Sequence, residues 1–239
     1  MKKIILIVIL FISIFSVHAQ TQNIPYEFPF KPGTEEWKQF KSGNEMVQAC
    51  KIPDSILISL STEALAKTCL SYPLLNEVFY ANNLQTGIKG VIKNFNGLSE
   101  LLKRKHAGQE IFKNKDKNVK DLKENINEVQ KGLFTFEFTY LELLLSQPQM
   151  LNNLSRNERI ELAKEAVRKY DNKKEKKDIF GEFGLTTTVF LIGKILNAEN
   201  KLMEVLKTVS QKEIDLFLAT VVYSNWSTIS AIYNAGKSL

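Results

Sequence analysis

Residues 189–206 (VFLIGKILNAENKLMEVL) form the stretch that decides the fold. Their apolar side chains recur at helical spacing and leave few polar positions, so we expect one long helix at the centre of the core. On either side, residues 155–158 (SRNE) and 210–213 (SQKE) form capping boxes. In such a box a serine caps the helix start and a glutamate three residues later caps the serine. Each box predicts the start of an amphipathic helix.

Helical spacing continues toward the N-terminus as far as residue 34, with breaks at proline, glycine and polar clusters. Residues 133–140 (LFTFEFTY) alternate with the period of a strand. A lone strand would have no partner in the chain, so we assign this stretch to a helix. The sequence predicts an all-α fold, an irregular array of about eight to eleven helices. The short antiparallel helix pairs expected in the first half resemble the helix pairs that stack in solenoid repeats.

Three prolines within residues 24–32 (IPYEFPFKP) exclude a helix there. We expect residues 20–33 to be an extended arm lying on the surface of the body. Residues 34–239 are then a single helical domain. The lysine-rich stretch 171–178 (DNKKEKKD) is expected to be a solvated connector and a weak boundary within that domain.

The first 19 residues have the order of a secretory signal peptide: two lysines, an apolar run, and Ala19 at the cleavage site. The competing interpretation is a retained membrane helix, which needs about 20 apolar residues. The run here ends near residue 17 and meets polar residues, which favours cleavage. We therefore expect a periplasmic or secreted protein with no transmembrane span after cleavage.

Cleavage removes Lys2 and Lys3 and lowers the formal charge from +6 to +4, because 30 basic side chains then face 26 acidic ones. So mild an excess in an exported chain excludes nucleic acid as the expected partner. The basic runs 103–106 (KRKH) and 173–177 (KKEKK) could bind phosphate or an anionic lipid surface. Such runs are more often solvated helix ends, and we expect that here.

Cys50 and Cys69 are the only cysteines of the chain. An oxidising compartment favours a disulfide between them. They lie 19 residues apart, and closing a loop of that size stabilises a fold by about 3 kcal/mol. Both also fall on the apolar side of expected helices, as buried free thiols do. We expect the disulfide, with two buried thiols as the alternative.

The composition excludes most cofactor chemistry. Cleavage also removes His18, and the remaining His106 and two cysteines are too few for a zinc finger or an iron–sulfur cluster, each of which takes four such ligands. The chain has no Gly-x-Ser-x-Gly elbow and no glycine-rich phosphate loop. We therefore expect no metal and no cofactor, and a binding protein rather than an enzyme.

Paired carboxylates are the one catalytic alternative that stays open. Glu137 and Glu142 lie in the most apolar neighbourhood of the chain. Burial would raise the pKa of either carboxyl group, as a general acid requires. An envelope hydrolase acting on peptidoglycan or another glycan could use such a pair. The competing interpretation is that both side chains face solvent.

Aromatic residues are the remaining lead to function, and they favour a protein or peptide partner whose identity the sequence leaves open. Aromatic clusters usually belong to a core, but exposed ones mark partner-binding grooves. The candidates for partner contact in and beside the arm are Tyr26, Phe28, Phe30 and Trp37. Further aromatics that could line a groove are Phe134, Phe136, Phe138 and Trp226.

A resemblance to other proteins rests on three stretches near the arm: residues 26–37 (YEFPFKPGTEEW), 46–50 (MVQAC) and 52–53 (IP). They are similar to the mature start of an uncharacterised group of exported, all-helical proteins from Bacteroidetes-type bacteria. The resemblance implies export, but it brings no activity and no catalytic residues. The triplet 54–56 (DSI) is similar to the signal for O-glycosylation of exported proteins in that phylum. It implies a glycan on Ser55.

Overall fold

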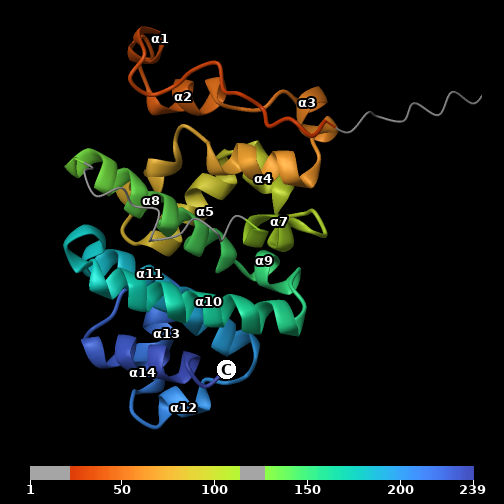
Figure 1. The fold of residues 1–239 in the computed structure, drawn as a ribbon. Helices are drawn as coiled ribbons and strands as arrows, with labels where there is room; N and C mark the ends of the chain where they lie inside the picture. Colours follow the sequence, from red (N-terminus) through yellow and green to blue (C-terminus); the bar gives the residue numbers. More distant parts are fainter. Residues whose placement is uncertain (1–21, 114–126) are drawn as a thin grey trace, which may run out of the picture.

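The structure is a computed structural model that describes residues 22–113 and 127–239 (Figure 1). The described residues form fourteen α-helices and one 3-10 helix, with a single isolated β-bridge and no strand. The all-α prediction is confirmed, whereas the predicted count of eight to eleven helices is too low. The predicted signal peptide, residues 1–19, and the first two residues of the arm lie outside the described residues.

The first half of the chain consists of short helices. They are α1 (Glu35–Lys38), α2 (Gly43–Ala49), α3 (Asp54–Ser59), α4 (Thr62–Leu70), the 3-10 helix η1 (Leu75–Tyr80), α5 (Leu84–Asn94), α6 (Asn96–Leu101) and α7 (Ala107–Lys113).

The second half contains the three longest helices. Its elements are α8 (Glu128–Leu145), α9 (Pro148–Asn152), α10 (Arg156–Glu175), α11 (Lys177–Ala198), α12 (Met203–Leu206), α13 (Gln211–Thr220) and α14 (Trp226–Gly236). The capping boxes expected at Ser155 and Ser210 are confirmed, with both reciprocal hydrogen bonds present in each. A third box, at Asn127, caps α8.

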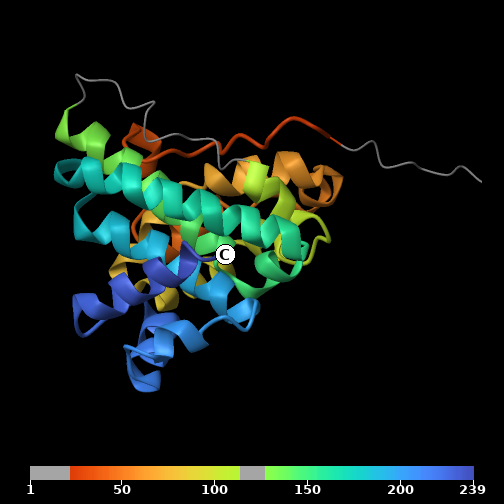
Figure 2. The same cartoon turned by 60° about the horizontal axis from the view of Figure 1, so that its bottom comes forward.

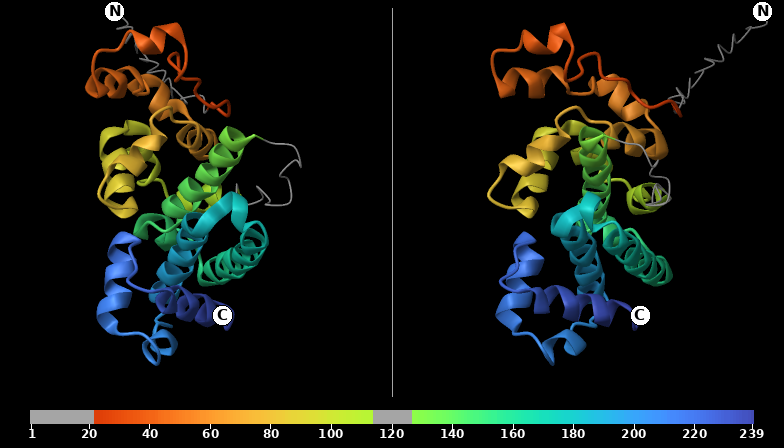
Figure 3. Two further views of the ribbon diagram at one scale, coloured as in Figure 1. Left: turned by 90° about the vertical axis from the view of Figure 1, so that its left-hand side faces the viewer. Right: turned by 60° about the vertical axis from the view of Figure 1, so that its left-hand side comes forward.

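The elements run broadly in chain order from one end of the molecule to the other (Figures 1 and 3), although α5 also packs against α13. Helices α1 to α3 lie at one end, α12 to α14 lie at the other, and α8, α10 and α11 cross the middle (Figure 2). Helix α11 is the central element, because it packs against α8, α10, α13 and α14. Val189, Phe190, Ile192 and Ile195 are fully buried in it, as expected of a core helix.

The expectation of one helix over 189–206 is wrong, because α11 ends at Ala198. Asn200 has a left-handed backbone (φ 56°). The Lys201 N–H donates to the Leu196 carbonyl at 2.7 Å, and the Asn200 N–H donates to the Asn197 carbonyl at 3.1 Å. These two bonds form a Schellman motif, which asparagine tolerates better than most residues. Met203 to Leu206 therefore form a separate helix.

A similar break ends the amphipathic helix that the capping box at 210–213 predicts. Val221 has a left-handed backbone (φ 69°) and forms the C-cap of α13. A β-branched residue rarely adopts this conformation, so the site stores strain that surrounding contacts must offset. Val221 is buried, and α14 starts afresh at Trp226, with Asn225 as its N-cap. These two breaks account for part of the larger number of helices.

The prediction that 133–140 is helical is confirmed, since these residues lie within α8. Their alternating aromatic side chains pack into two separate clusters on different faces of the helix. Phe138 packs edge-on against Phe180, with ring centroids 5.8 Å apart. Phe136 points to Phe79, with centroids 4.6 Å apart. The strand-like alternation therefore reflects two packing faces.

The prediction of a solvated connector at 171–178 is wrong for its first five residues, which continue α10. Only Lys176 separates α10 from α11, and Gly181 bends the start of α11 with a left-handed backbone (φ 57°). Lys173 is fully buried. A lysine can be buried in this way only if a partner offsets the loss of solvation.

Residues 22–33 contain no helix, and a turn at residues 32–33 precedes α1. Gln22 bridges to the segment after α3: its N–H donates to the Ser59 carbonyl at 2.7 Å, and its carbonyl accepts from the Ser61 N–H at 2.8 Å. The Tyr26 N–H donates to the Thr68 hydroxyl at 2.9 Å. Phe28 is 4% exposed and belongs to the core. The arm is thus an integral part of the body.

Candidate functional site

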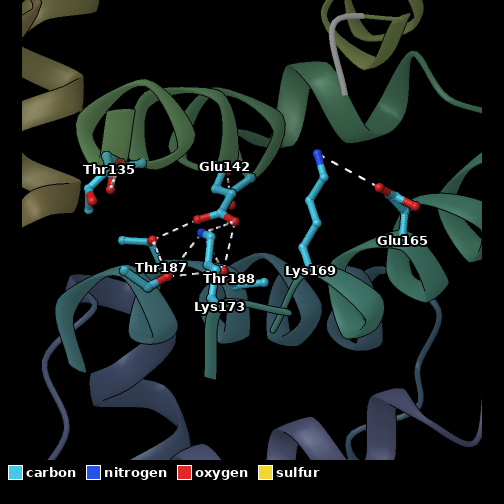
Figure 4. A network of polar contacts seen from close by, with 10 residues as sticks. Thr135, Glu142, Glu165, Lys169, Lys173, Thr187 and Thr188 are labelled. Atoms are coloured by element: carbon cyan, nitrogen blue, oxygen red, sulfur yellow. Dashed lines mark hydrogen bonds and ion pairs between the residues drawn. The ribbon is translucent and has the colours of Figure 1, made fainter. Parts of the chain in front are cut away.

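The most polar feature of the core is an ion pair between Glu142 on α8 and Lys173 on α10 (Figure 4). Lys173 Nζ lies 2.7 Å from Glu142 Oε1, and the two side chains are 0% and 4% exposed. Two threonines of α11, Thr187 and Thr188, complete the network. Three helices therefore meet at one buried charge pair.

Each group in the network has a hydrogen-bond partner. Besides Glu142, Lys173 Nζ donates to the Thr188 hydroxyl at 2.8 Å and to the Gly184 carbonyl at 3.1 Å. The Thr188 hydroxyl donates to Glu142 Oε1 at 2.7 Å, and the Thr187 hydroxyl donates to Glu142 Oε2 at 2.6 Å. The three ammonium protons and both carboxylate oxygens are thus engaged. Such complete pairing is what a buried ion pair requires.

Aromatic rings enclose the ammonium group. Lys173 Nζ lies 5.0 Å from the centroid of the Phe138 ring and 5.5 Å from that of Phe180. Burial among these side chains lowers the pKa of Lys173, and Glu142 opposes that shift. One turn earlier on α10, burial also lowers the pKa of Lys169, whose Nζ lies 3.8 Å from Glu165 Oε1.

Lysines with a lowered pKa are typical of amine catalysis, but access decides against that role here. The cavity that borders Glu142, Glu165 and Lys169 measures about 10 Å³. A space of that size holds at most one water molecule. The network therefore fixes the packing of α8, α10 and α11 and admits no substrate.

The two candidate catalytic carboxylates do not share a cleft. Glu142 is buried in the ion pair, whereas Glu137 is exposed on another face of α8. The interpretation that both face solvent is therefore wrong for Glu142. Paired carboxylate catalysis needs both groups at one sugar ring, and these positions do not provide it.

A surface with exposed aromatic side chains lies where η1, α8 and α11 meet. Phe79 contacts Phe136 and Phe183, with ring centroids 4.6 and 5.6 Å apart. Phe136 and Phe183 are 38% and 39% exposed. On α8, Val129 (71% exposed) and Leu133 (58% exposed) lie on the same face as Phe136 at i, i+4, i+7 spacing. We call these five residues the aromatic surface.

A hollow continues this surface toward α13. It measures about 310 Å³ and is lined mainly by apolar atoms, including side chains of Leu84, Phe183, Val222 and Tyr223. The strained Val221 also lines it. An apolar surface with an adjoining hollow is typical of protein-binding sites.

A larger cleft of about 610 Å³ lies between α10, α14 and the start of α11. It is lined by three lysines and three aromatic residues, among other side chains: Lys174, Lys177, Lys237, Tyr170, Trp226 and Tyr233. We call it the lysine cleft. The expectation that the lysine run 173–177 is solvated is wrong for Lys173, which is buried, whereas Lys174 and Lys177 are exposed and line the cleft.

No family model, curated protein or solved structure matches this chain. The geometry of these surfaces is therefore the basis for assigning a function.

Within residues 22–113 and 127–239, no group of three His, Cys, Asp or Glu side chains is placed to hold a metal ion. One described helix, α11, is long and apolar enough to cross a membrane. Its most apolar window is 72% buried by the rest of the protein, as in the core helix of a soluble fold.

The cysteines are free thiols, and both are fully buried. The expected Cys50–Cys69 disulfide is therefore not formed, and the alternative of two buried thiols describes the structure. Burial raises the pKa of Cys50 to about 11 and that of Cys69 well above its usual value. Neither thiol is suited to nucleophilic chemistry, because the thiolate is the reactive form.

The remaining predicted site residues lie apart from both surfaces. Tyr26, Phe30 and Trp37 are partly exposed, and Phe30 and Trp37 both pack edge-on against Phe40. Ser55 is exposed in the first turn of α3, where a modifying enzyme could reach it.

Sequence reasoning named Phe136 and Trp226 as groove candidates but missed their neighbours. Phe79 and Phe183 are distant in sequence, and only the packing of η1 on α8 and α11 brings them together. Lys237, the C-cap residue of α14, joins Trp226 on one face, a spacing that the helical period could have revealed.

Proposed function

We propose that this protein is an exported, non-catalytic helical protein that binds another protein, and that the partner docks an amphipathic helix on the aromatic surface. The observation that carries the proposal is the exposed stripe Val129, Leu133 and Phe136 on α8, which leads into the Phe79–Phe183 cluster.

The spacing of the stripe supports a helical partner. Side chains at i, i+4 and i+7 form a narrow apolar face of the kind that packs against a similar face of another helix. Exposure falls along α8 from 71% at Val129 to 38% at Phe136 and 8% at Tyr140. The stripe thus runs from solvent to the edge of the core, and a partner helix would extend the core outward.

The cluster of rings supplies the anchor. Phe79 touches Phe136, Tyr140 and Phe183, so its ring is held from three sides. Rigid, partly buried aromatics contribute most of the binding energy at protein interfaces. The adjoining hollow of about 310 Å³ could take one large apolar side chain of the partner.

Export is the second part of the proposal. It rests on the order of residues 1–19 and on the resemblance of the arm region to exported Bacteroidetes-type proteins. A periplasmic or secreted location follows. The exposed position of Ser55 is compatible with the glycosylation that the same resemblance implies.

We also infer that the short helices of the first half stack as antiparallel pairs in the manner of solenoid repeats. Such stacks leave one face open to a partner.

Affinity capture tests the proposal. The mature chain from Gln20 is incubated with detergent-treated envelopes, and bound proteins are identified by mass spectrometry. We expect one dominant partner, which a crosslinker placed at residue 133 joins to the chain. The double variant Leu133→Asp/Phe136→Asp should lose it, because charges would face the apolar side of the docking helix.

The matched control is Ile58→Asp, which places a charge at a side chain 74% exposed on α3, far along the chain from the aromatic surface. It should retain the partner. Equal capture by all three proteins, or loss in the control alone, would refute docking at the aromatic surface.

A further inference from the structure

The lysine cleft has features of a binding site for a small ligand, separate from the aromatic surface. We propose that it binds a small acidic sugar, that is, a sugar ring that carries a carboxylate or a phosphate group. The proposal rests on the charge of the cleft, on the fixation of its rings and on its size.

The lining carries an excess of positive charge. Three of the lining residues are lysines, and the sole carboxylate among the described lining residues is Glu182. Lys177 Nζ lies 3.5 Å from Glu182 Oε1. The other two lysines of the lining, Lys174 and Lys237, form no ion pair with this carboxylate. A concave site with an excess of one sign of charge attracts ligands of the opposite charge.

The aromatic floor of the cleft is held in place before any ligand arrives. Tyr233 packs on the buried Tyr170, with ring centroids 4.4 Å apart. Its hydroxyl donates to Asp171 Oδ1 at 2.5 Å, and Lys237 Nζ lies 4.8 Å from its ring centroid. A site that is already ordered loses little entropy on binding.

The remaining lining groups suit a polyhydroxylated ring. Trp226 is partly buried and presents an apolar indole to the cleft. Ser230 and Asn234 follow it on the same face of α14 and supply a hydroxyl and an amide. A few polar groups beside an aromatic face can fix the orientation of a sugar, while lysines bind its anionic substituent.

The volume of the cleft sets the class of ligand. At about 610 Å³ it lies within the range of about 300–1,000 Å³ that is usual for small-molecule sites. A mono- or disaccharide fits that range.

Calorimetry on the mature chain at low salt tests the proposal. The five probes are glucuronic acid, glucose 6-phosphate, glucose, inorganic phosphate and a hexaglutamate peptide. We expect at least one of the two acidic sugars to bind at least 10-fold more tightly than glucose and inorganic phosphate. Which acidic sugar binds better distinguishes a carboxylate from a phosphate ligand.

Three results would overturn the proposal: no binding of either acidic sugar, binding of inorganic phosphate as tight as that of the sugars, or tighter binding of the peptide. The last would assign the cleft to an acidic protein segment. None of these results bears on docking at the aromatic surface.

Variants localise the binding. Lys174→Gln/Lys237→Gln should weaken binding of the acidic sugar at least 10-fold, and Trp226→Leu should weaken both the acidic sugar and residual glucose binding. Lys164→Gln/Lys212→Gln carries the same change in net charge at two exposed lysines that do not line the cleft. This control should bind the acidic sugar as the wild type does. If it weakened binding as much as Lys174→Gln/Lys237→Gln, the attraction would be nonspecific.

Discussion

Lys173 Nζ lies 2.7 Å from Glu142 Oε1 at a place where neither side chain has appreciable contact with solvent. The pair joins α10 to α8, and the hydroxyls of Thr187 and Thr188 bring α11 to the same carboxylate. Hydrogen bonds of fixed geometry between three helices specify their register more strictly than apolar contacts do. The pair therefore matters for the uniqueness of the fold as well as for its stability.

The variant Lys173→Met should lower the free energy of unfolding by about 3–5 kcal/mol, because it leaves the Glu142 carboxylate buried without its partner. Urea denaturation followed by circular dichroism measures the change. Glu137→Gln, an exposed carboxylate on the same helix, should change stability by less than about 0.5 kcal/mol.

The double variant Glu142→Leu/Lys173→Met should be more stable than Lys173→Met alone, since no charge remains buried. The hydroxyls of Thr187 and Thr188 can still donate to the Gly184 carbonyl. A single variant as stable as wild type would contradict the assigned role of the pair.

Replacing Cys50 by alanine should change how stability depends on pH. In the unfolded chain the thiol loses its proton near pH 9, whereas burial raises the pKa of Cys50 to about 11 in the folded state. Between these values the folded protein binds more protons than the unfolded chain, so the free energy of unfolding falls as pH rises. The expected slope is about 1.4 kcal/mol per pH unit from this thiol.

Denaturation curves are measured between pH 8 and 11. The free energy of unfolding of the wild type should fall with rising pH by the contribution of the Cys50 thiol, and that of Cys50→Ala should lack this contribution. Cys69 and the other tyrosines titrate in both proteins, whereas the Cys50 thiolate also raises the pKa of Tyr26 and Tyr72, so the difference includes that smaller coupling. Identical slopes would indicate that Cys50 has no titratable proton, as in a disulfide.

Phe28→Ala should destabilise the protein by about 3–5 kcal/mol, because Phe28 fills a buried site against Tyr72 and Phe95. Phe30→Ala on the same arm should cost much less, since Phe30 is only partly buried. Thermal denaturation compares the two variants. Equal effects would show that the arm does not anchor at Phe28.

Two glycines of α5 form a matched pair. A Cβ at Gly87 would collide with the backbone carbonyl of Val78, whereas one at Gly90 would meet no atom within 4 Å. Gly90→Ala should therefore stabilise the protein by up to about 1 kcal/mol through helix propensity. Gly87→Ala should destabilise it, because η1 must move away. Stabilisation by both substitutions would contradict the close approach of η1 and α5.

Local signals in the sequence located helix starts well. Ser155 and Ser210 each place a glutamate three residues later, and both helices begin there. The ends were harder to locate. Asn200 and Val221 stop their helices by adopting a left-handed backbone, and apolar spacing carries no sign of that choice.

The buried charge escaped prediction for a related reason. Lys173 stands in the run DNKKEKKD, whose composition is that of a solvated segment. Its burial depends on Glu142, 31 residues earlier, and on Gly184, 11 residues later. A pairing across three helices is a tertiary property, so the sequence indicates the lysine and the glutamate but not their contact.

The bridge between Gln22 and Leu60 places the first described residue of the chain at one end of the molecule. This point lies beside Leu60 near the α3 end, while the lysine cleft lies among α10, α11 and α14 in the opposite half of the molecule (Figure 1). A molecule held at Gln22, whether to a surface or to a fused domain, would thus present the cleft outward. An affinity tag belongs at that same end, since Lys237, two residues before the C-terminal Leu239, lines the cleft.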